Sequence, residues 1–232
     1  DMGFIHDVKK IVAMIPKERQ TLFFSATMPD QVAKLANTML QDPVRIEVAP
    51  NSTVADKIEQ KVLFVDRSKK QSLLSHFLRE GHTGRTIVFA RTKHRADRVA
   101  KALKRDNIAA EAIHSDKAQG ARQRALAAFA KGKVEVLVAT DIVSRGIDVE
   151  EVNYVVNFDL PDDPENYVHR IGRTARAGAE GIAISFCDAE EDTKLRAIEK
   201  IIGTQITKDL DHSYHSDEAQ DAYQSSSNTS LK

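Results

Sequence analysis

The chain has 232 residues, of which 41% are hydrophobic, and a formal net charge of zero, so one or two folded domains are expected. It has no run of about 18 apolar residues, and its first residues lack the basic-then-apolar pattern of a secretory signal, so neither a membrane span nor a leader is predicted. Cys187 is the single cysteine, which excludes a disulfide framework. Its place after the apolar run Ile182–Phe186 indicates a core thiol in a reducing cytosol.

The zero net charge hides two stretches of opposite charge. Residues 67–133 contain 17 Lys or Arg and 5 Asp or Glu, a net charge of +12. Residues 148–221 contain 7 Lys or Arg and 18 Asp or Glu, a net charge of −11. This asymmetry suggests a basic surface for a polyanion, although solvated helix faces are the simpler explanation on charge alone.

Short apolar strands alternate with longer amphipathic helices along the chain. The predicted strands are Thr21–Phe24, Lys61–Val65, Thr86–Phe89, Ala110–Ile113, Val134–Ala139, Tyr154–Phe158 and Ile182–Phe186. The predicted helices are Ile5–Met14, Pro29–Leu40, Lys69–Arg79, Lys93–Arg105, Gln119–Ala130, Pro164–Ile171 and Glu190–Ile202. Nearly continuous apolar strands such as Val134–Ala139 suit a parallel sheet covered on both faces. The repeated strand–helix–strand order therefore predicts an α/β fold with a doubly wound parallel sheet and helices on both faces.

The chain is predicted to divide at residues 49–57, a linker that opens with a loop-like Ala-Pro-Asn-Ser-Thr run. Residues 1–48 offer one strand and two helices, too few to close a sheet, so they are expected to be the remnant of another domain with exposed apolar faces. Residues 58–210 supply six strands and five helices, enough for a complete domain. Residues 211–232 are rich in Ser, Asp, Gln, His and Tyr, which predicts a disordered tail.

Small hydroxyl residues, charges and glycines follow the predicted strands at their carboxyl ends. These stretches are Ser25-Ala26-Thr27, Ala90-Arg91-Thr92-Lys93, His114-Ser115-Asp116 and Thr140-Asp141, the last continued by Arg145-Gly146-Ile147-Asp148. In an open parallel sheet these ends lie at one edge, where ligands bind. Helix capping explains any single member, such as Thr92 or Ser25, but it explains the whole set less well.

The densest cluster of charge directly follows Tyr167 and Val168. It consists of His169, Arg170, Arg173 and Arg176. Arginines three residues apart share one face of a helix, and clustered guanidinium groups repel one another unless they meet anions. Because the planar donor fork of arginine suits phosphate, phosphate binding is the favoured interpretation. Internal pairing with acidic residues such as Asp162, Asp163 or Glu165 is the alternative.

Taken together, these stretches resemble the motifs of the DEAD-box RNA helicases of superfamily two, most closely the bacterial RhlE type. The similar segments are Ser25–Thr27 for motif III, Ile87–Lys93 for motif IV, Gln119–Arg122 for motif IVa, Val138–Asp148 for motif V and His169–Arg176 for motif VI. Order and spacing agree over about residues 1–205. Motifs V and VI in this order are very specific.

The resemblance implies an enzyme with two RecA-like domains, with ATP and Mg²⁺ in the cleft between them and RNA across both. This chain resembles the end of the first domain, the linker and the whole second domain. The phosphate loop, the Asp-Glu-Ala-Asp motif and the adenine-reading glutamine motif do not occur in the sequence. Negligible ATP hydrolysis by this polypeptide alone is therefore predicted, along with a cytoplasmic, bacterial setting and no metal ligand in the chain.

The resemblance also implies roles for the residues near ATP. Arg173 and Arg176 would reach the γ-phosphate as arginine fingers. The coupling residues Ser25 and Thr27 would be contacted by His169. Asp148 would accept a hydrogen bond from the ATP ribose, with Gly146 allowing close approach of the backbone.

On the RNA side, the implied contacts are to phosphates and 2′-hydroxyl groups, and so to the backbone rather than the bases. The residues are Thr92, Lys93, Arg122, Thr140 and Arg145. Nearby aromatic residues fit core positions instead of a base-stacking platform; they are Phe77, Phe89 and Phe129. Two other functions stay open: an isolated RNA-binding module without catalysis, and a DNA helicase or remodeller of the same superfamily.

The sequence departs from the family's pattern at three positions. Ser115 stands where the family usually has Gly, Ser144 where it has Ala, and Ala175 where it has Gly. A serine at 115 is expected to weaken or shift an RNA contact if backbone amides approach the RNA there. The other two changes are small and are expected to be tolerated.

Overall fold

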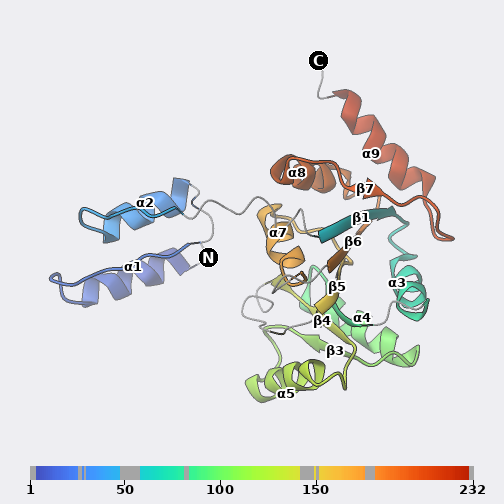
Figure 1. The fold of residues 1–232 in the computed structure, drawn as a ribbon, viewed down its shortest axis with the longest axis horizontal. Helices are drawn as coiled ribbons and strands as arrows, with labels where there is room; N and C mark the ends of the chain where they lie inside the picture. The colour runs from blue at the N-terminus through green and yellow to red at the C-terminus, as the bar shows by residue number, and fades with distance from the viewer. Residues whose placement is uncertain are drawn as a thin grey trace. The chain divides into compact units, whose positions relative to one another are not determined.

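The structure is a computed structural model that describes residues 4–25, 28, 30–47, 58–80, 84–141, 149, 152–175 and 181–229. The chain forms two compact units, residues 1–49 and 50–232, and each is described by itself (Figure 1).

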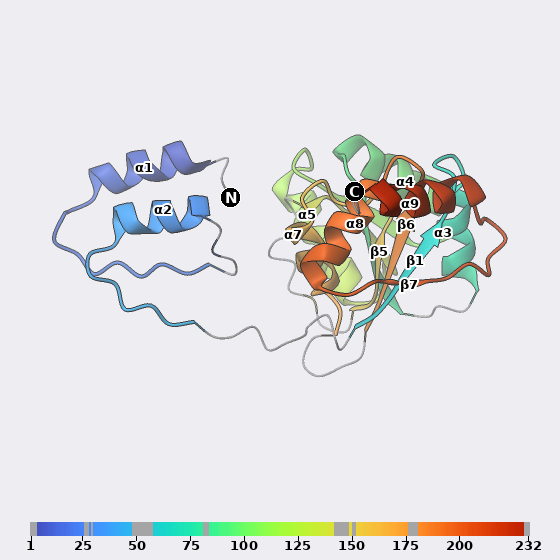
Figure 2. The same ribbon diagram turned by 90° about the horizontal axis from the view of Figure 1, so that it is seen from above.

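The smaller unit contains two helices, α1 (Ile5–Met14) and α2 (Asp30–Met39), which lie side by side in both ribbon views (Figures 1 and 2). The strand predicted at Thr21–Phe24 is wrong, because these residues belong to no strand. A strand needs a neighbouring backbone to satisfy its N–H and C=O groups, and the described part of this unit holds no other strand.

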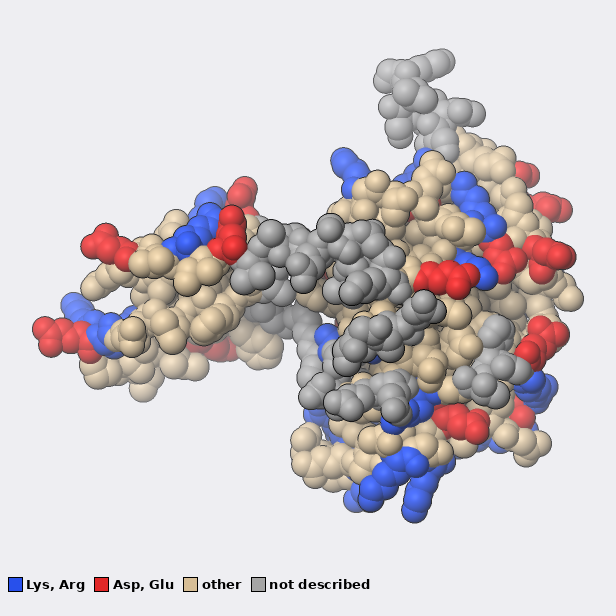
Figure 3. Space-filling model, in the orientation of Figure 1, with Lys and Arg blue, Asp and Glu red and all other residues tan. Residues whose placement is uncertain are grey.

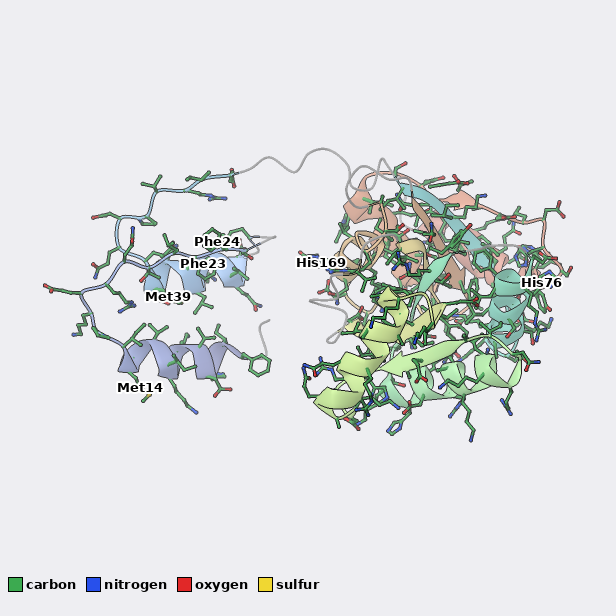
Figure 4. The ribbon with its side chains drawn as sticks, turned by 60° about the horizontal axis from the view of Figure 1, so that its bottom comes forward. Met14, Phe23, Phe24, Met39, His76 and His169 are labelled. Atoms are coloured by element: carbon green, nitrogen blue, oxygen red, sulfur yellow. The ribbon has the colours of Figure 1, made fainter. Side chains whose placement is uncertain are left out.

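Apolar side chains of the smaller unit are largely exposed, as predicted. Met14 is 84% exposed and Phe24 87% exposed, and Ala36 is the only buried residue among those described in this unit. Figure 4 shows Phe23 and Phe24 on the segment that runs beside α2. Both amphipathic helices therefore keep apolar surface that a fuller domain would cover.

The larger unit is built on a parallel sheet. Its described strands are β1 (Ile58–Phe64), β2 (Arg85–Phe89), β3 (Ala110–Ile113), β4 (Val136–Ala139), β5 (Val152–Asn157), β6 (Gly181–Cys187) and β7 (Thr207–Lys208). Their order is β3-β4-β2-β5-β6-β1-β7, and every pair is parallel. The predicted doubly wound sheet is confirmed, and the two-residue β7 is an addition that the sequence did not predict.

Helices cover both faces of this sheet. One face carries α3 (Lys70–Arg79) and α4 (Lys93–Arg105), and the other carries α5 (Gln119–Ala130), α7 (Glu165–Ile171) and α8 (Asp192–Ile202). Neighbouring strand residues point to opposite faces, as the pleat requires. On β1, for example, Leu63 packs with the α3 and α4 side, whereas Val62 and Phe64 pack with the α7 and α8 side.

Several core predictions are confirmed by burial. Phe77, Phe89 and Phe129 are buried, so none of them is a stacking platform. Cys187 is a buried free thiol, and its burial raises the pKa of the thiol well above the usual range, which makes it a packing residue and not a nucleophile. None of the helices in the described ranges is long and apolar enough to cross a membrane.

The disorder predicted for residues 211–232 is wrong for α9 (Asp217–Thr229). This helix packs beside α8 (Figures 1 and 2). Tyr223 is only 4% exposed, and its ring lies 5.6 Å from that of Phe64. Ala219 is also buried. Residues four apart in a helix lie on the same face, so Ala219 and Tyr223 pack together against the rest of the unit. Two such residues are too few to make the composition of residues 211–232 look ordered.

Candidate functional site

Polar residues that follow the strands meet at the carboxyl edge of the sheet, as predicted. They include Thr92 after β2, His114 after β3, Thr140 and Asp141 after β4, Asp159 after β5 and Asp188 after β6. Because all of these strands are parallel, their carboxyl ends share one edge. This is the edge where open α/β sheets bind ligands.

Arg170 on α7 is locked into this edge. It is only 1% exposed. Its Nε and Nη2 donate to the two carboxylate oxygens of Asp141 at 2.6 and 2.8 Å, and its Nη1 donates to Asn157 Oδ1 and to the carbonyl oxygen of Asp159 at 3.2 and 2.7 Å. The guanidinium carbon also lies 4.9 Å from the centre of the Phe89 ring. Internal pairing, the alternative interpretation, therefore holds for Arg170, although Asp141 is its carboxylate partner.

A second set of buried charges fixes the loop between β2 and α4. Asp159 accepts a hydrogen bond from the backbone N–H of Arg91 at 2.9 Å and forms an ion pair with Arg95, whose Nε lies 3.1 Å away. Arg91 also donates to Glu191 at 2.6 Å. Glu191 in turn pairs with the fully buried Lys70 at 2.5 Å. These ion pairs tie α3, α4 and the start of α8 to the sheet, so Thr92 and the first residue of α4, Lys93, have a rigid support.

His169 and Arg173 occupy the part of α7 and its C-terminal turn that is only half-buried. Arg173 Nε donates to the backbone carbonyl oxygen of His169 at 3.1 Å, which orients the arginine stem along the helix. Figure 4 shows His169 at the margin of the larger unit, on the side opposite His76. The helix therefore buries one arginine as an anchor, while His169 on it and Arg173 in the turn that follows are only half-buried.

The residues predicted to meet RNA surround the first turns of α4 and α5. Thr92 caps α4, since its Oγ1 accepts from the backbone N–H of Arg95 at 3.2 Å. Lys93 Nζ lies 2.5 Å from Asp116 Oδ2, and that ammonium holds the pKa of the Asp116 carboxyl below its usual range. Arg122, in the first turn of α5, is half-buried, and its Nε has no hydrogen-bond partner among the described residues.

Of the remaining predicted site residues, two are described by the structure and five are not. Thr140 follows β4 and is half-buried, and Ser25 lies in the smaller unit. Five others lie outside the described residues: Thr27, Arg145, Gly146, Asp148 and Arg176. Within the described ranges, no group of three or more His, Cys, Asp or Glu residues is placed to hold a metal ion.

Sequence reasoning missed the ionic supports of the site. Asp159 and Asp188 each follow an apolar strand directly or by one residue, and that position alone marks them as candidates for the sheet edge. No local signal pairs Lys70 with Glu191, because 121 positions separate them in the chain.

Comparisons with known proteins agree with the fold and the motifs. Residues 68–178 match the family described as helicase conserved C-terminal domain. The chain is 45% identical over 200 residues to the DEAD-box ATP-dependent RNA helicase CshA of Bacillus subtilis, a match that covers 86% of this chain and 40% of that protein. The chain therefore spans about two fifths of the length of this curated relative.

Solved structures give the same picture. The Escherichia coli DEAD-box protein SrmB, solved with the regulator of ribonuclease activity A, is 38% identical, with a TM-score of 0.63; the match covers 66% of this chain and 91% of SrmB in that structure. Saccharomyces cerevisiae Dbp5, solved with RNA and ADP BeF3, is 30% identical, with a TM-score of 0.82, over 100% of this chain and 60% of Dbp5. The likeness over the whole chain confirms the predicted RecA-like fold class.

Proposed function

This chain belongs to the DEAD-box RNA helicase family, and from that premise we propose that it supplies the second RecA-like half of an ATP-dependent enzyme that unwinds or remodels RNA duplexes. The observation that carries the proposal is that Arg170 of α7 is buried as an anchor, while His169 on the same helix and Arg173 just after it are only half-buried. Residues 1–48 would complete the first domain, residues 49–57 would link the two, and residues 58–210 would form the second.

On the nucleotide side, Arg173 and Arg176 act on phosphate. ATP bound in the interdomain cleft would supply the phosphoryl group that is transferred to water. Arginines held beside that group stabilise the negative charge that develops on it, an effect worth about 10³–10⁵ in rate in related nucleotidases. Arg173 suits this role because the helix just before it is anchored through Arg170, so its backbone is already positioned when phosphate binds.

The other nucleotide contacts complete one wall of the cleft. Asp148 would accept from the ribose beside Gly146, and His169 would couple this wall to Ser25 and Thr27. The described residues offer cations for phosphate but no cluster of carboxylates for Mg²⁺, so the ion would be held by groups outside this set. Because the sequence contains neither the phosphate loop nor the Asp-Glu-Ala-Asp motif, we infer that the polypeptide by itself hydrolyses ATP negligibly.

On the RNA side, the edge presents hydroxyl and cationic groups rather than aromatic rings. The proposed contacts are Thr92, Lys93, Arg122, Thr140 and Arg145. The half-buried guanidinium group of Arg122 is suited to an RNA phosphate, and Thr140 to a 2′-hydroxyl group. RNA bound to the yeast relative Dbp5 supports this assignment. The bacterial relatives support a bacterial protein, while the cytoplasmic setting and the likeness to the RhlE type stay predictions.

The nucleotide role is tested in the full-length protein that contains this chain. Arg173→Ala should lower RNA-stimulated ATP hydrolysis at least about 10³-fold while RNA affinity stays near that of the parent. Lys200→Ala, which removes an exposed cation from the last turn of α8, is the matched control and should leave hydrolysis unchanged. Wild-type turnover by Arg173→Ala would contradict the proposal.

The choice of RNA is tested with the 232-residue chain itself. Matched RNA and DNA strands should bind with different affinity, RNA more tightly, because contacts to 2′-hydroxyl groups are possible only with RNA. Equal affinity for the two strands would favour the DNA helicase or remodeller alternative. RNA binding without any ATP hydrolysis in the full-length protein would favour the non-catalytic module.

A further inference from the structure

A stripe of basic side chains runs along the outer face of α4. His94, Arg98, Lys101 and Arg105 follow one another at steps of four, three and four residues, and all four are exposed. These steps place them on one side of the helix. At about 1.5 Å of rise per residue, the stripe extends roughly 16 Å from the first to the last. It begins beside Thr92 and Lys93, the proposed RNA contacts at the start of the same helix.

The acidic residues of this region are already engaged elsewhere. The pairs are Glu80 with His76, Asp97 with His114 and Lys117, Asp106 with Arg79, Glu111 with Lys104, and Asp116 with Lys93, at 2.5–3.6 Å. These five are all the acidic residues between positions 67 and 133. In the part of the chain that the structure describes, no ion pair joins Arg98, Lys101 or Arg105 to a carboxylate.

The uncompensated charge continues around the edge of the sheet. β3 is the outermost strand on this side, with α4 on one face and α5 on the other. Arg124 on α5, together with Lys131 and Lys133 after it, is also exposed and forms no ion pair with a described residue. Figure 3 shows Lys and Arg side chains gathered at the end of the larger unit where Figure 1 places α5.

We propose that RNA continues beyond the motif edge along α4, with phosphates of its flanking segment on Arg98, Lys101 and Arg105. The proposal rests on the RNA site proposed at Thr92 and Lys93, from which the stripe is continuous. Like charges at these spacings repel one another within a helix. The phosphates of a bound polyanion would neutralise these cations, and binding would also release counterions from the polyanion.

RNA fits this surface better than an acidic protein does. The exposed residues of α4 are all charged or histidine: His94, Asp97, Arg98, Lys101, Lys104 and Arg105. Protein interfaces centre on apolar and aromatic residues and are depleted in lysine at the core, and the outer face of this helix offers no such centre. A row of cations without an apolar anchor is the footprint of backbone binding to nucleic acid.

The experiment compares two RNA strands on the 232-residue chain. A short strand fills the motif edge only, and a second strand is longer by about five nucleotides, the length that covers the stripe at about 3.4 Å per nucleotide. The variant carries Arg98→Gln, Lys101→Gln and Arg105→Gln. The control carries Arg67→Gln, Lys69→Gln and Lys104→Gln, which remove the same charge from cations that pair with Glu190, Asp66 and Glu111.

Binding is measured by fluorescence anisotropy over a salt series, with circular dichroism to show that each variant folds. The stripe variant should lose the extra affinity for the longer strand, about tenfold or more, and its salt slope on that strand should fall by about two, since each single-strand phosphate contributes about 0.7. Its affinity for the short strand should stay close to that of the parent, and the control should keep the longer-strand advantage.

Three results would overturn the inference. If the stripe variant keeps the full advantage of the longer strand, RNA does not follow α4, and an acidic protein becomes the candidate partner. If the control loses as much of its extra affinity for the longer strand as the stripe variant does, the net charge of the chain alone determines RNA affinity. If the parent chain binds neither strand, the proposed RNA site itself fails, and the inference fails with it.

Discussion

Arg170 and Asp141 form a bidentate ion pair, with Nε and Nη2 of the arginine 2.6 and 2.8 Å from the two carboxylate oxygens. The pair joins the end of β4 to α7 across 29 positions of the chain. Two further acceptors, Asn157 Oδ1 and the carbonyl oxygen of Asp159, use the remaining guanidinium nitrogen. The buried cation of Arg170 thus helps to hold α7, which carries His169 and directly precedes Arg173, to the sheet.

Arg170→Met should therefore destabilise the larger unit strongly. It leaves a carboxylate and two polar oxygens without their donor, a loss expected to cost about 3–5 kcal/mol in the free energy of unfolding. Urea denaturation measures it. Arg124→Met, which removes an exposed cation, should change stability by no more than about 0.5 kcal/mol. Equal effects from the two substitutions would show that the clamp contributes little.

The fold of the larger unit was largely predictable because its signals are local. The helix predicted at Lys93–Arg105 has the observed bounds, and so does the strand at Ala110–Ile113. Apolar periodicity and a capping threonine are enough to place them. The strand expected at Thr21–Phe24 failed because pairing depends on other strands. Helix α9 was missed because few apolar residues mark its buried face, Ala219 and Tyr223 among those whose burial is described.

For the site, the sequence predicted which residues lie at the sheet edge but not which arginine is buried. Motif order placed Thr92, Lys93 and Arg122 at one edge, since the ends of parallel strands coincide. The burial of Arg170 was not predictable, because three arginines of equal spacing do not reveal which one meets a carboxylate. That choice depends on Asp141, whose nearness to α7 is a property of the folded sheet.

Ala175 adopts a left-handed backbone conformation, with φ of 55°. This region costs a non-glycine residue about 1–2 kcal/mol, and glycine reaches it freely. Ala175→Gly loses a partly buried methyl group, worth less than about 0.8 kcal/mol, so we expect a net stabilisation of about 0.5–1 kcal/mol. Thermal unfolding measures it.

Asn107 provides the control for this substitution, because its φ is 60° and asparagine tolerates the left-handed region better than alanine. Asn107→Gly should leave the unfolding temperature nearly unchanged. A decrease in stability for Ala175→Gly would mean that methyl packing outweighs backbone strain at this turn, and that alanine is the better residue there.

His212 makes the C-terminal segment sensitive to acid. Burial lowers the pKa of its imidazole below the usual 6.5, and the neighbouring His215, whose ring centre is 5.6 Å away, lowers it further, while Asp209 and Asp211 oppose the shift. Because the folded state binds this proton less readily than the unfolded state, its contribution to stability is intact above about pH 6.5 and is lost as the pH falls through the lowered pKa.

The measurement is thermal unfolding of the parent and of His212→Gln across this pH range. The parent should lose more stability on acidification than the variant, which has no imidazole to protonate at this position. Carboxylates titrate in both proteins, so the difference between the two curves isolates the histidine. Parallel curves would mean that the imidazole accepts its proton in the folded state without penalty.

Tyr223 is the anchor that docks α9. Its hydroxyl donates to Glu199 at 2.7 Å, and its ring lies below the cations of Arg196 and Lys208 at 4.6 and 4.7 Å from the ring centre. Burial and the nearby Glu199 carboxylate raise the pKa of Tyr223 to about 12, so the hydroxyl stays a neutral donor. A disordered tail would make none of these contacts.

Two substitutions separate the ring from the hydroxyl. Tyr223→Ala removes a buried aromatic side chain and should cost about 3 kcal/mol or more in unfolding free energy, whereas Tyr223→Phe keeps the ring and should cost about 1 kcal/mol for the lost hydrogen bond. Gln224→Ala, on the exposed side of α9, should be neutral. Limited proteolysis should cut residues 217–229 faster in Tyr223→Ala than in the parent, and equal cleavage rates would mean that the helix does not depend on this ring for its docking.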